Sequence, residues 1–130
     1  MLKKTIKYTD YDGEVREEDF YFNLRKDEIM EFNFNANLKL SEQIQAIIKA
    51  KDTKEIYALF KKIVLLAYGE KSADGKHFRK SEQISQDFES TQAFSELIME
   101  LVQDENKAAN FIKMVLPQDI DIPVKELPAE

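Results

Sequence analysis

The order of apolar and polar residues predicts a β-hairpin at the start of the chain. Residues 2–9 alternate between two sets, a pattern typical of a half-buried strand. The sets are Leu2, Lys4, Ile6 and Tyr8 against Lys3, Thr5, Lys7 and Thr9. Turn residues follow at 10–13, and 14–22 is the expected return strand. The register stays open, because a shift by one residue keeps lysines opposite acidic residues but exchanges the two faces.

Helical spacing dominates the rest of the chain. The first expected helix begins at Asn23 or Leu24 and runs to residue 33, with a break at the asparagine-rich residues 33–37. Further helices are expected at residues 42–51, 53–68, 82–88, 92–103 and 104–116. The residues that suit their N-terminal caps are Ser41, Asp52, Ser81, and Ser90 or Thr91, while Asp104 is expected to begin the last helix. Pro117 stops the last helix.

The third of these helices is the expected core of the molecule. Its apolar residues share one face: Ile56, Leu59, Phe60, Ile63, Val64, Leu66 and Ala67. Gly69 is expected to end this helix as a positive-φ residue. A loop with a turn at Ala73-Asp74-Gly75 should follow over residues 70–80.

These elements define the fold class as α+β. One domain is expected over residues 1–117, with the hairpin at 2–22 and an irregular bundle of about six short helices at 24–116. Residues 118–130 are expected to form a flexible tail. Within that tail, Asp119-Ile120-Asp121-Ile122-Pro123-Val124 alternates acidic and apolar residues. This segment could instead add to a partner as an edge strand.

Composition excludes most chemistry. The chain of 130 residues carries 19 Lys and Arg against 25 Asp and Glu, a net charge of -6, which disfavours nucleic acid as a partner. It has no cysteine, one histidine and three glycines, so thiolate metal sites, imidazole pairs and glycine-rich phosphate loops are disfavoured. The longest apolar run, residues 63–68, is too short to span a membrane, and no signal peptide is evident. We therefore expect neither an enzyme nor a cofactor.

Two short motifs look like ligand-binding loops. We favour a hairpin turn for the first and no phosphate site for the second. Asp10-x-Asp12-Gly13 resembles the start of a calcium loop, but the glycine comes too early and Tyr21 stands where a closing glutamate is needed. Gly69-Glu70-Lys71-Ser72 lacks the upstream glycine of a phosphate loop. His77 has no nucleophile marked by a glycine elbow and is expected in an exposed loop.

Residues 68–80 hold a basic and aromatic cluster on an otherwise acidic chain. The candidate partner-binding residues are Tyr68, Lys71, Lys76, Phe78, Arg79 and Lys80. Arginine pairs with carboxylates and aromatic rings anchor apolar groups, so the cluster suits an acidic helix or peptide. The alternative is a solvated loop with one buried phenylalanine.

Three segments also resemble a known family. They are Lys4-Thr5-Ile6-Lys7-Tyr8-Thr9-Asp10-Tyr11-Asp12-Gly13, Arg16-Glu17-Glu18-Asp19-Phe20-Tyr21-Phe22-Asn23-Leu24, and Tyr68-Gly69-Glu70-Lys71-Ser72-Ala73-Asp74-Gly75-Lys76-His77-Phe78 with Lys80-Ser81-Glu82. Together they are similar to tail assembly chaperones of long-tailed phages and prophages of Gram-positive bacteria. The chain departs from the family where Arg25 replaces a Ser or Thr helix cap, and at residues 34–37, where a glycine-containing break is usual.

The resemblance implies a non-catalytic protein of the host bacterial cytoplasm, absent from the finished virion. Its partner would be the tape measure protein, which it would keep soluble until tail tube subunits polymerise and displace it. The tail tube protein, a frameshifted longer form and further copies of the chain are additional expected contacts. The alternatives are a structural tail component, such as a tube-associated or completion protein, and an acidic DNA mimic that inhibits a host enzyme. Interleaved acidic and basic residues disfavour the DNA mimic.

Overall fold

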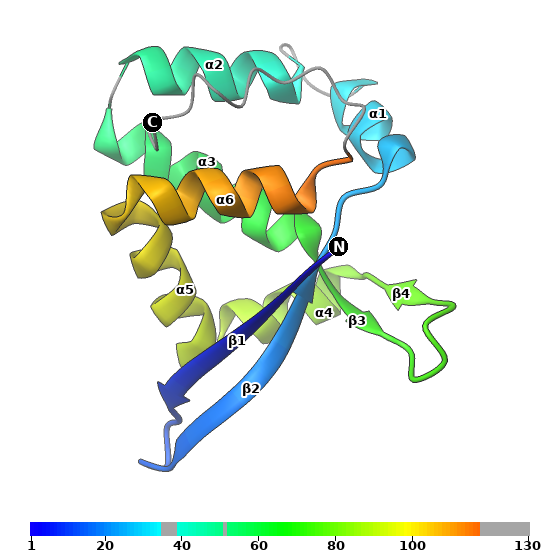
Figure 1. Cartoon of the computed structure of the whole chain (residues 1–130), viewed down its shortest axis with the longest axis vertical. Helices are drawn as coiled ribbons and strands as arrows, with labels where there is room; N and C mark the ends of the chain where they lie inside the picture. Colours follow the sequence, from blue (N-terminus) through cyan, green and yellow to red (C-terminus); the bar gives the residue numbers. More distant parts are fainter. Residues whose placement is uncertain (35–38, 51, 118–130) are drawn as a thin grey trace.

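The computed structural model describes residues 1–34, 39–50 and 52–117, and it confirms the α+β class (Figure 1). Its strands are β1 (Leu2–Thr9), β2 (Val15–Phe22), β3 (Tyr68–Lys71) and β4 (Phe78–Arg79). Its helices are α1 (Lys26–Phe34), α2 (Leu40–Ala50), α3 (Thr53–Ala67), α4 (Glu82–Glu89), α5 (Gln92–Gln103) and α6 (Glu105–Val115). The expected flexible tail at 118–130 and most of the asparagine-rich break lie outside the described residues.

The four strands form one antiparallel sheet in the order β1-β2-β3-β4. The register that the sequence left open pairs Leu2 with Phe22 and Thr9 with Val15. The two hairpins point to different sides of the molecule (Figure 1). Only part of the expected charge pairing is realised: Lys7 stands opposite Glu17, whereas Lys4 stands opposite Phe20 and its ammonium binds Glu100 of α5 at 2.5 Å.

The turn between β1 and β2 is confirmed. The Asp10 carboxylate accepts hydrogen bonds from the backbone N–H groups of Asp12 and Glu14, both at 2.9 Å, and Gly13 has a φ of 83°. The Arg16 guanidinium, 2.5 Å from this carboxylate, lowers the pKa of Asp10. Asp10 is thus occupied in closing the hairpin, as an aspartate at the start of a tight turn usually is.

Alternation in this register gives the first hairpin an inner and an outer face. Phe22 and Ile6 are buried on the inner face, toward the helices. The outer face carries Lys3, Thr5, Lys7, Thr9, Val15, Glu17, Asp19 and Tyr21, all exposed except the half-buried Tyr21. Half of the sheet surface is therefore open to solvent, as is common for antiparallel sheets.

An aromatic cluster joins the inner face of the sheet to the helices. The Tyr68 ring stacks on Phe88 of α4, with centroids 4.1 Å apart. Phe88 also lies 5.3 Å from Phe20 and 5.6 Å from Phe94. Phe22 makes an edge contact with Phe111 of α6 at 5.2 Å. The expected core helix is confirmed in α3, where Leu59, Phe60, Ile63, Val64 and Ala67 are buried.

Three of the expected caps are confirmed by side-chain hydrogen bonds to backbone N–H groups: Asp52 for α3, Ser81 for α4 and Thr91 for α5. Asp104, expected as the first residue of the last helix, is instead the cap of α6. Each satisfies donors that the first helical turn leaves without a partner.

Two helix starts differ from the expectation. Ser41 is not a cap: α2 begins at Leu40, and the backbone N–H of Lys39 donates to the Glu42 carboxylate at 2.9 Å. α1 begins at Lys26, and the N–H of Arg25 donates to Glu28 at 2.8 Å. In both places a glutamate three residues on provides half of a capping box without a Ser or Thr.

The expectation for residues 69–80 was wrong in two respects. Gly69 is not a positive-φ helix end: α3 ends at Ala67, the extended Tyr68 follows with φ -68° and ψ 141°, and Gly69 is buried in β3. Residues 70–80 are not a plain loop either, because β3 and β4 form a second hairpin. Its turn does lie at the predicted site, where Gly75 has a φ of 77°.

Candidate functional site

One residue from each strand contributes to an amphipathic surface on the outside of the sheet. We call Lys3, Tyr21, Lys71 and Phe78 the basic–aromatic face. Lys71 lies over the Tyr21 ring, with its Nζ 5.7 Å from the centroid, and Phe78 is opposite Lys71 in the register. Lys3 is opposite Tyr21. Two half-buried rings are therefore flanked by two exposed ammonium groups on a surface outside the core.

Gly69 makes this surface possible. It stands opposite Tyr21, so a side chain here would point to the outer face. A Cβ atom at residue 69 would lie 2.7 Å from the Phe78 ring and 2.9 Å from the Arg79 carbonyl oxygen. Glycine lets the Phe78 ring lie across the strand, which a larger residue would prevent.

Gly69→Ala is therefore expected to destabilise the protein by about 1–3 kcal/mol, because the added methyl overlaps a main-chain oxygen as well as a ring. Chemical denaturation would measure the change. The matched control is Gly69→Ala combined with Phe78→Ala, which removes the ring but leaves the carbonyl overlap. If Gly69→Ala costs less than half as much stability in the Phe78→Ala background as in the wild type, the ring accounts for the larger share of the loss. Equal stability of Gly69→Ala and the wild type would contradict the packing.

The sequence-predicted site residues separate onto different surfaces. Lys71 and Phe78 belong to the basic–aromatic face, and Lys76 and Arg79 are exposed nearby on the same hairpin. Tyr68 faces the opposite way: it stands opposite the fully buried Phe22 and stacks on Phe88. Burial raises the pKa of the Tyr68 hydroxyl. Tyr68 is thus part of the aromatic cluster.

Lys80 is occupied by contacts within the molecule. Its Nζ donates to the carbonyl oxygens of Asn23 at 2.6 Å and Leu66 at 3.0 Å, and to the Glu28 carboxylate at 2.7 Å. It also lies 5.6 Å from the Phe78 ring centroid. Burial lowers the pKa of the Lys80 ammonium, and Glu28 opposes that shift. Lys80 ties the end of β2, α1 and the end of α3 to the second hairpin.

Sequence reasoning missed Lys3 and Tyr21. Tyr21 lies in the aromatic run Phe20-Tyr21-Phe22, which suggested packing without indicating a side. Its position between two inward-facing phenylalanines is the signal that places it outside, because neighbours in a strand point to opposite faces.

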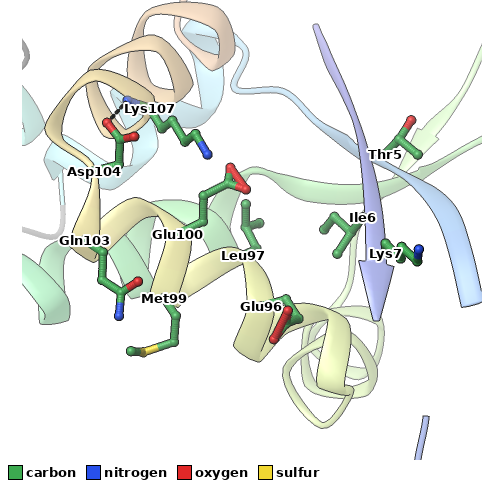
Figure 2. A pocket seen from close by; sticks show the side chains of 10 residues that line it. All are labelled: Thr5, Ile6, Lys7, Glu96, Leu97, Met99, Glu100, Gln103, Asp104 and Lys107. Atoms are coloured by element: carbon green, nitrogen blue, oxygen red, sulfur yellow. Dashed lines mark hydrogen bonds between the residues drawn. The ribbon is translucent and has the colours of Figure 1, made fainter. Parts of the chain in front are cut away.

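The second surface is a cleft between β1 and α5 (Figure 2). This cleft has a volume of about 650 Å³. Its lining residues are Thr5, Ile6, Lys7, Glu96, Leu97, Met99, Glu100, Gln103, Asp104 and Lys107. The buried Ile6 and Leu97 provide its apolar part, whereas the Met99 side chain is exposed.

The described residues show neither a metal-ligand cluster nor a membrane-spanning helix. His77 is exposed in the second hairpin, and its backbone N–H donates to Ser72 Oγ at 3.0 Å. Within residues 1–34, 39–50 and 52–117, no group of three or more His, Asp or Glu side chains could hold a metal ion. The helices of the same ranges include none that is long and apolar enough to cross a membrane. Rings beside ammonium groups suit the binding of a polypeptide with acidic and apolar side chains.

The chain also matches a known protein family. The model of a family described as phage tail assembly chaperone matches residues 1–127. The chain therefore belongs to the phage tail assembly chaperone family, as the three segments predicted. No curated protein and no solved structure matches the chain.

Proposed function

We propose that the protein binds the tape measure protein of a long-tailed phage, keeps it soluble in the host cytoplasm, and is displaced as the tail tube polymerises. It acts without catalysis and does not remain in the virion. The observation that carries the proposal is the family match over residues 1–127. The basic–aromatic face supports it, since it offers rings and cations on a surface outside the core.

The proposed contact is the basic–aromatic face together with the exposed Lys76 and Arg79. Tyr21 and Phe78 would cover apolar residues of the partner, while Lys3 and Lys71 would pair with its carboxylates. Surface ion pairs are individually weak, so affinity would depend on repeated contacts along an elongated partner. A frameshifted longer form or further copies of the chain could supply that repetition, and incoming tail tube protein would replace these weak contacts one at a time.

Co-expression with the tape measure protein encoded beside this gene would test the proposal. The wild type is expected to increase the soluble fraction of that protein and to co-purify with it. The double variant Lys3→Glu with Lys71→Glu is expected to lose most of both effects, because it reverses the charge around the rings. Unchanged solubility together with no co-purification by the wild type would overturn the proposed function.

The matched control is Lys49→Glu with Lys54→Glu, at exposed positions on α2 and α3. Each Lys→Glu change contributes -2, so both double variants have a net charge of -10 instead of -6. Equal loss in the two variants would mean that total charge, and not the basic–aromatic face, determines binding. Circular dichroism would verify that both variants are folded.

A further inference from the structure

β1 is an edge strand with an open side. In the described part of the chain it pairs only with β2. The backbone N–H of Asp10 donates to the Glu14 carbonyl at 2.8 Å, which makes residues 10 and 14 a hydrogen-bonded pair. Such pairs alternate along an antiparallel ladder, so Lys4, Ile6 and Tyr8 bond to β2. The N–H and C=O groups of Lys3, Thr5 and Lys7 therefore point away from β2, to the open edge.

This edge borders a groove with an apolar floor. The cleft of Figure 2 adjoins Thr5, Ile6 and Lys7. A smaller hollow of about 140 Å³ adjoins Leu2 and Lys4, and Lys107 lines both. We call the two together the β1 groove. Met99 and Met114, each about half exposed at 46% and 52%, stand on its rim.

Lysines on the outer side of the edge favour an acidic occupant there, although the cleft itself is also lined by Glu96 and Asp104. Lys3 and Lys7 are exposed next to the open edge, and Lys107 lines the groove. Among the described residues, no carboxylate lies within ion-pair distance of the Lys7 or Lys107 ammonium, and Lys3 reaches Asp19 only at 3.9 Å. Glu100 is already paired with Lys4. A strand added here would need acidic residues on its outer face and apolar residues on its inner face.

Residues 119–122, Asp119-Ile120-Asp121-Ile122, have that alternation. Their two isoleucines would face Ile6, Leu97 and the exposed Met99, and their two aspartates would face the lysines of β1. Pro123 has no backbone N–H and would end the pairing.

The path of α6 leads the chain to this groove. Lys107 in its first turn lies near Thr5–Lys7, and Met114 in its last turn lies near Leu2, so α6 runs back along β1. The Val115 carbonyl accepts from the Leu24 N–H at 2.9 Å, beside the pair Phe22–Leu2. The chain thus leaves α6 close to the start of β1. Four extended residues span about 13 Å, enough to cover half of β1.

We propose that residues 119–122 pair with the open edge of β1 in the same molecule as a parallel fifth strand that fills the β1 groove. This pairing lies within one molecule of the protein and does not rest on the proposed contact with the tape measure protein. Residues 119–122 are connected to the end of α6, which lies beside this edge. Their effective concentration at the edge is therefore higher than that of a strand from another molecule.

Amide hydrogen exchange on the full-length protein would test the pairing. The amides of Thr5 and Lys7 are expected to exchange at least about tenfold more slowly in the wild type than in Ile120→Asp with Ile122→Asp. The amides of Ile6 and Tyr8, which bond to β2, are the internal reference and should not change. The matched control is Val124→Asp with Leu127→Asp, which makes the same number of apolar-to-acidic changes beyond the pairing segment and should keep the protection.

Three outcomes would overturn the proposal. Equal exchange of Thr5 and Lys7 in the wild type and the isoleucine variant would mean that the edge stays solvated. Equal loss of protection in both double variants would mean that no specific segment pairs. Protection that increases with protein concentration would assign the edge to a second copy of the chain. None of these outcomes bears on solubilisation of the tape measure protein, so the two proposals fail independently.

A charge exchange gives a second, independent measurement. Lys7→Glu is expected to speed exchange of the Thr5 amide by placing an acid beside the two aspartates. Adding Asp119→Lys and Asp121→Lys to that variant should restore the protection. If the protection of the Thr5 amide were not restored, charge complementarity would not select residues 119–122 as the occupant, and the proposal would lose that support.

Discussion

Phe88→Ala is expected to lower the free energy of unfolding by about 3–5 kcal/mol. Phe88 is only 2% exposed and contacts rings from three other elements, with Tyr68 stacked on it at 4.1 Å. Removing it leaves a cavity between the sheet and the helices, and the surrounding rings cannot all close into it. A loss of this size is a large fraction of the total stability of a small domain. Urea denaturation followed by circular dichroism would measure it.

Phe34→Ala is the matched control, since it makes the same chemical change at a residue that is 73% exposed. Its expected effect is within about 0.5 kcal/mol of the wild type. If the two variants differed by less than about 1 kcal/mol, the aromatic cluster would not hold the sheet to the helices.

Lys80→Met is expected to destabilise the protein by about 2–4 kcal/mol. Methionine keeps much of the aliphatic stem but removes the Nζ donor, which leaves the carbonyls of Asn23 and Leu66 and the Glu28 carboxylate without it. The side chains of Lys80 and Glu28 are 19% and 16% exposed, so water compensates only in part. Thermal and chemical denaturation would measure the loss.

Lys76→Met is the control for this substitution, because Lys76 is exposed at the turn of the same hairpin. Combining Lys80→Met with Glu28→Gln should recover part of the loss, since the glutamine leaves no uncompensated charge. Equal stabilities of the Lys76 and Lys80 variants would show that the three contacts of Lys80 contribute nothing net.

Local signals in the sequence were enough for most of the elements. The caps Asp52, Ser81 and Thr91 act on backbone groups two or three residues away, so a short window contains the whole interaction. Gly69 was misread because its constraint comes from Phe78 and Arg79, nine and ten residues on. A glycine after a helix has two explanations, positive φ or close packing, and only the tertiary structure distinguishes them.

The candidate site was predicted less well, for a related reason. Tyr68 and Phe78 were grouped because they are close in sequence, yet they occupy opposite faces of one sheet. Which side a strand residue faces depends on where the strand begins, and the strands β3 and β4 were not predicted. Lys80 was assigned to binding as a cation near aromatic residues, and its engagement with Asn23, Leu66 and Glu28 depends on residues 14 to 57 positions away.

The last of the three segments that resemble the chaperone family, residues 68–82, forms the second hairpin and the start of α4. Tyr68 stacks on Phe88, Gly69 admits the Phe78 ring, Gly75 forms the turn, and Ser81 caps α4. Lys71, Lys76 and Arg79 are among the exposed residues of this hairpin, and their side chains lie outside the core. Specificity for a partner is therefore expected to reside in these exposed residues and in Tyr21.

The contact between Phe22 and Phe111 has a consequence for synthesis on the ribosome. The two rings are 89 positions apart, since 111 minus 22 is 89. At about 5–20 residues per second, Phe22 emerges about 4–18 seconds before Phe111 of α6. Phe88 of α4, which contacts both Phe20 and Phe22, is made earlier, so during that interval the two rings lack only their cover from the later helices. The aromatic cluster that joins the sheet to the helices is therefore completed only when α6 has been made.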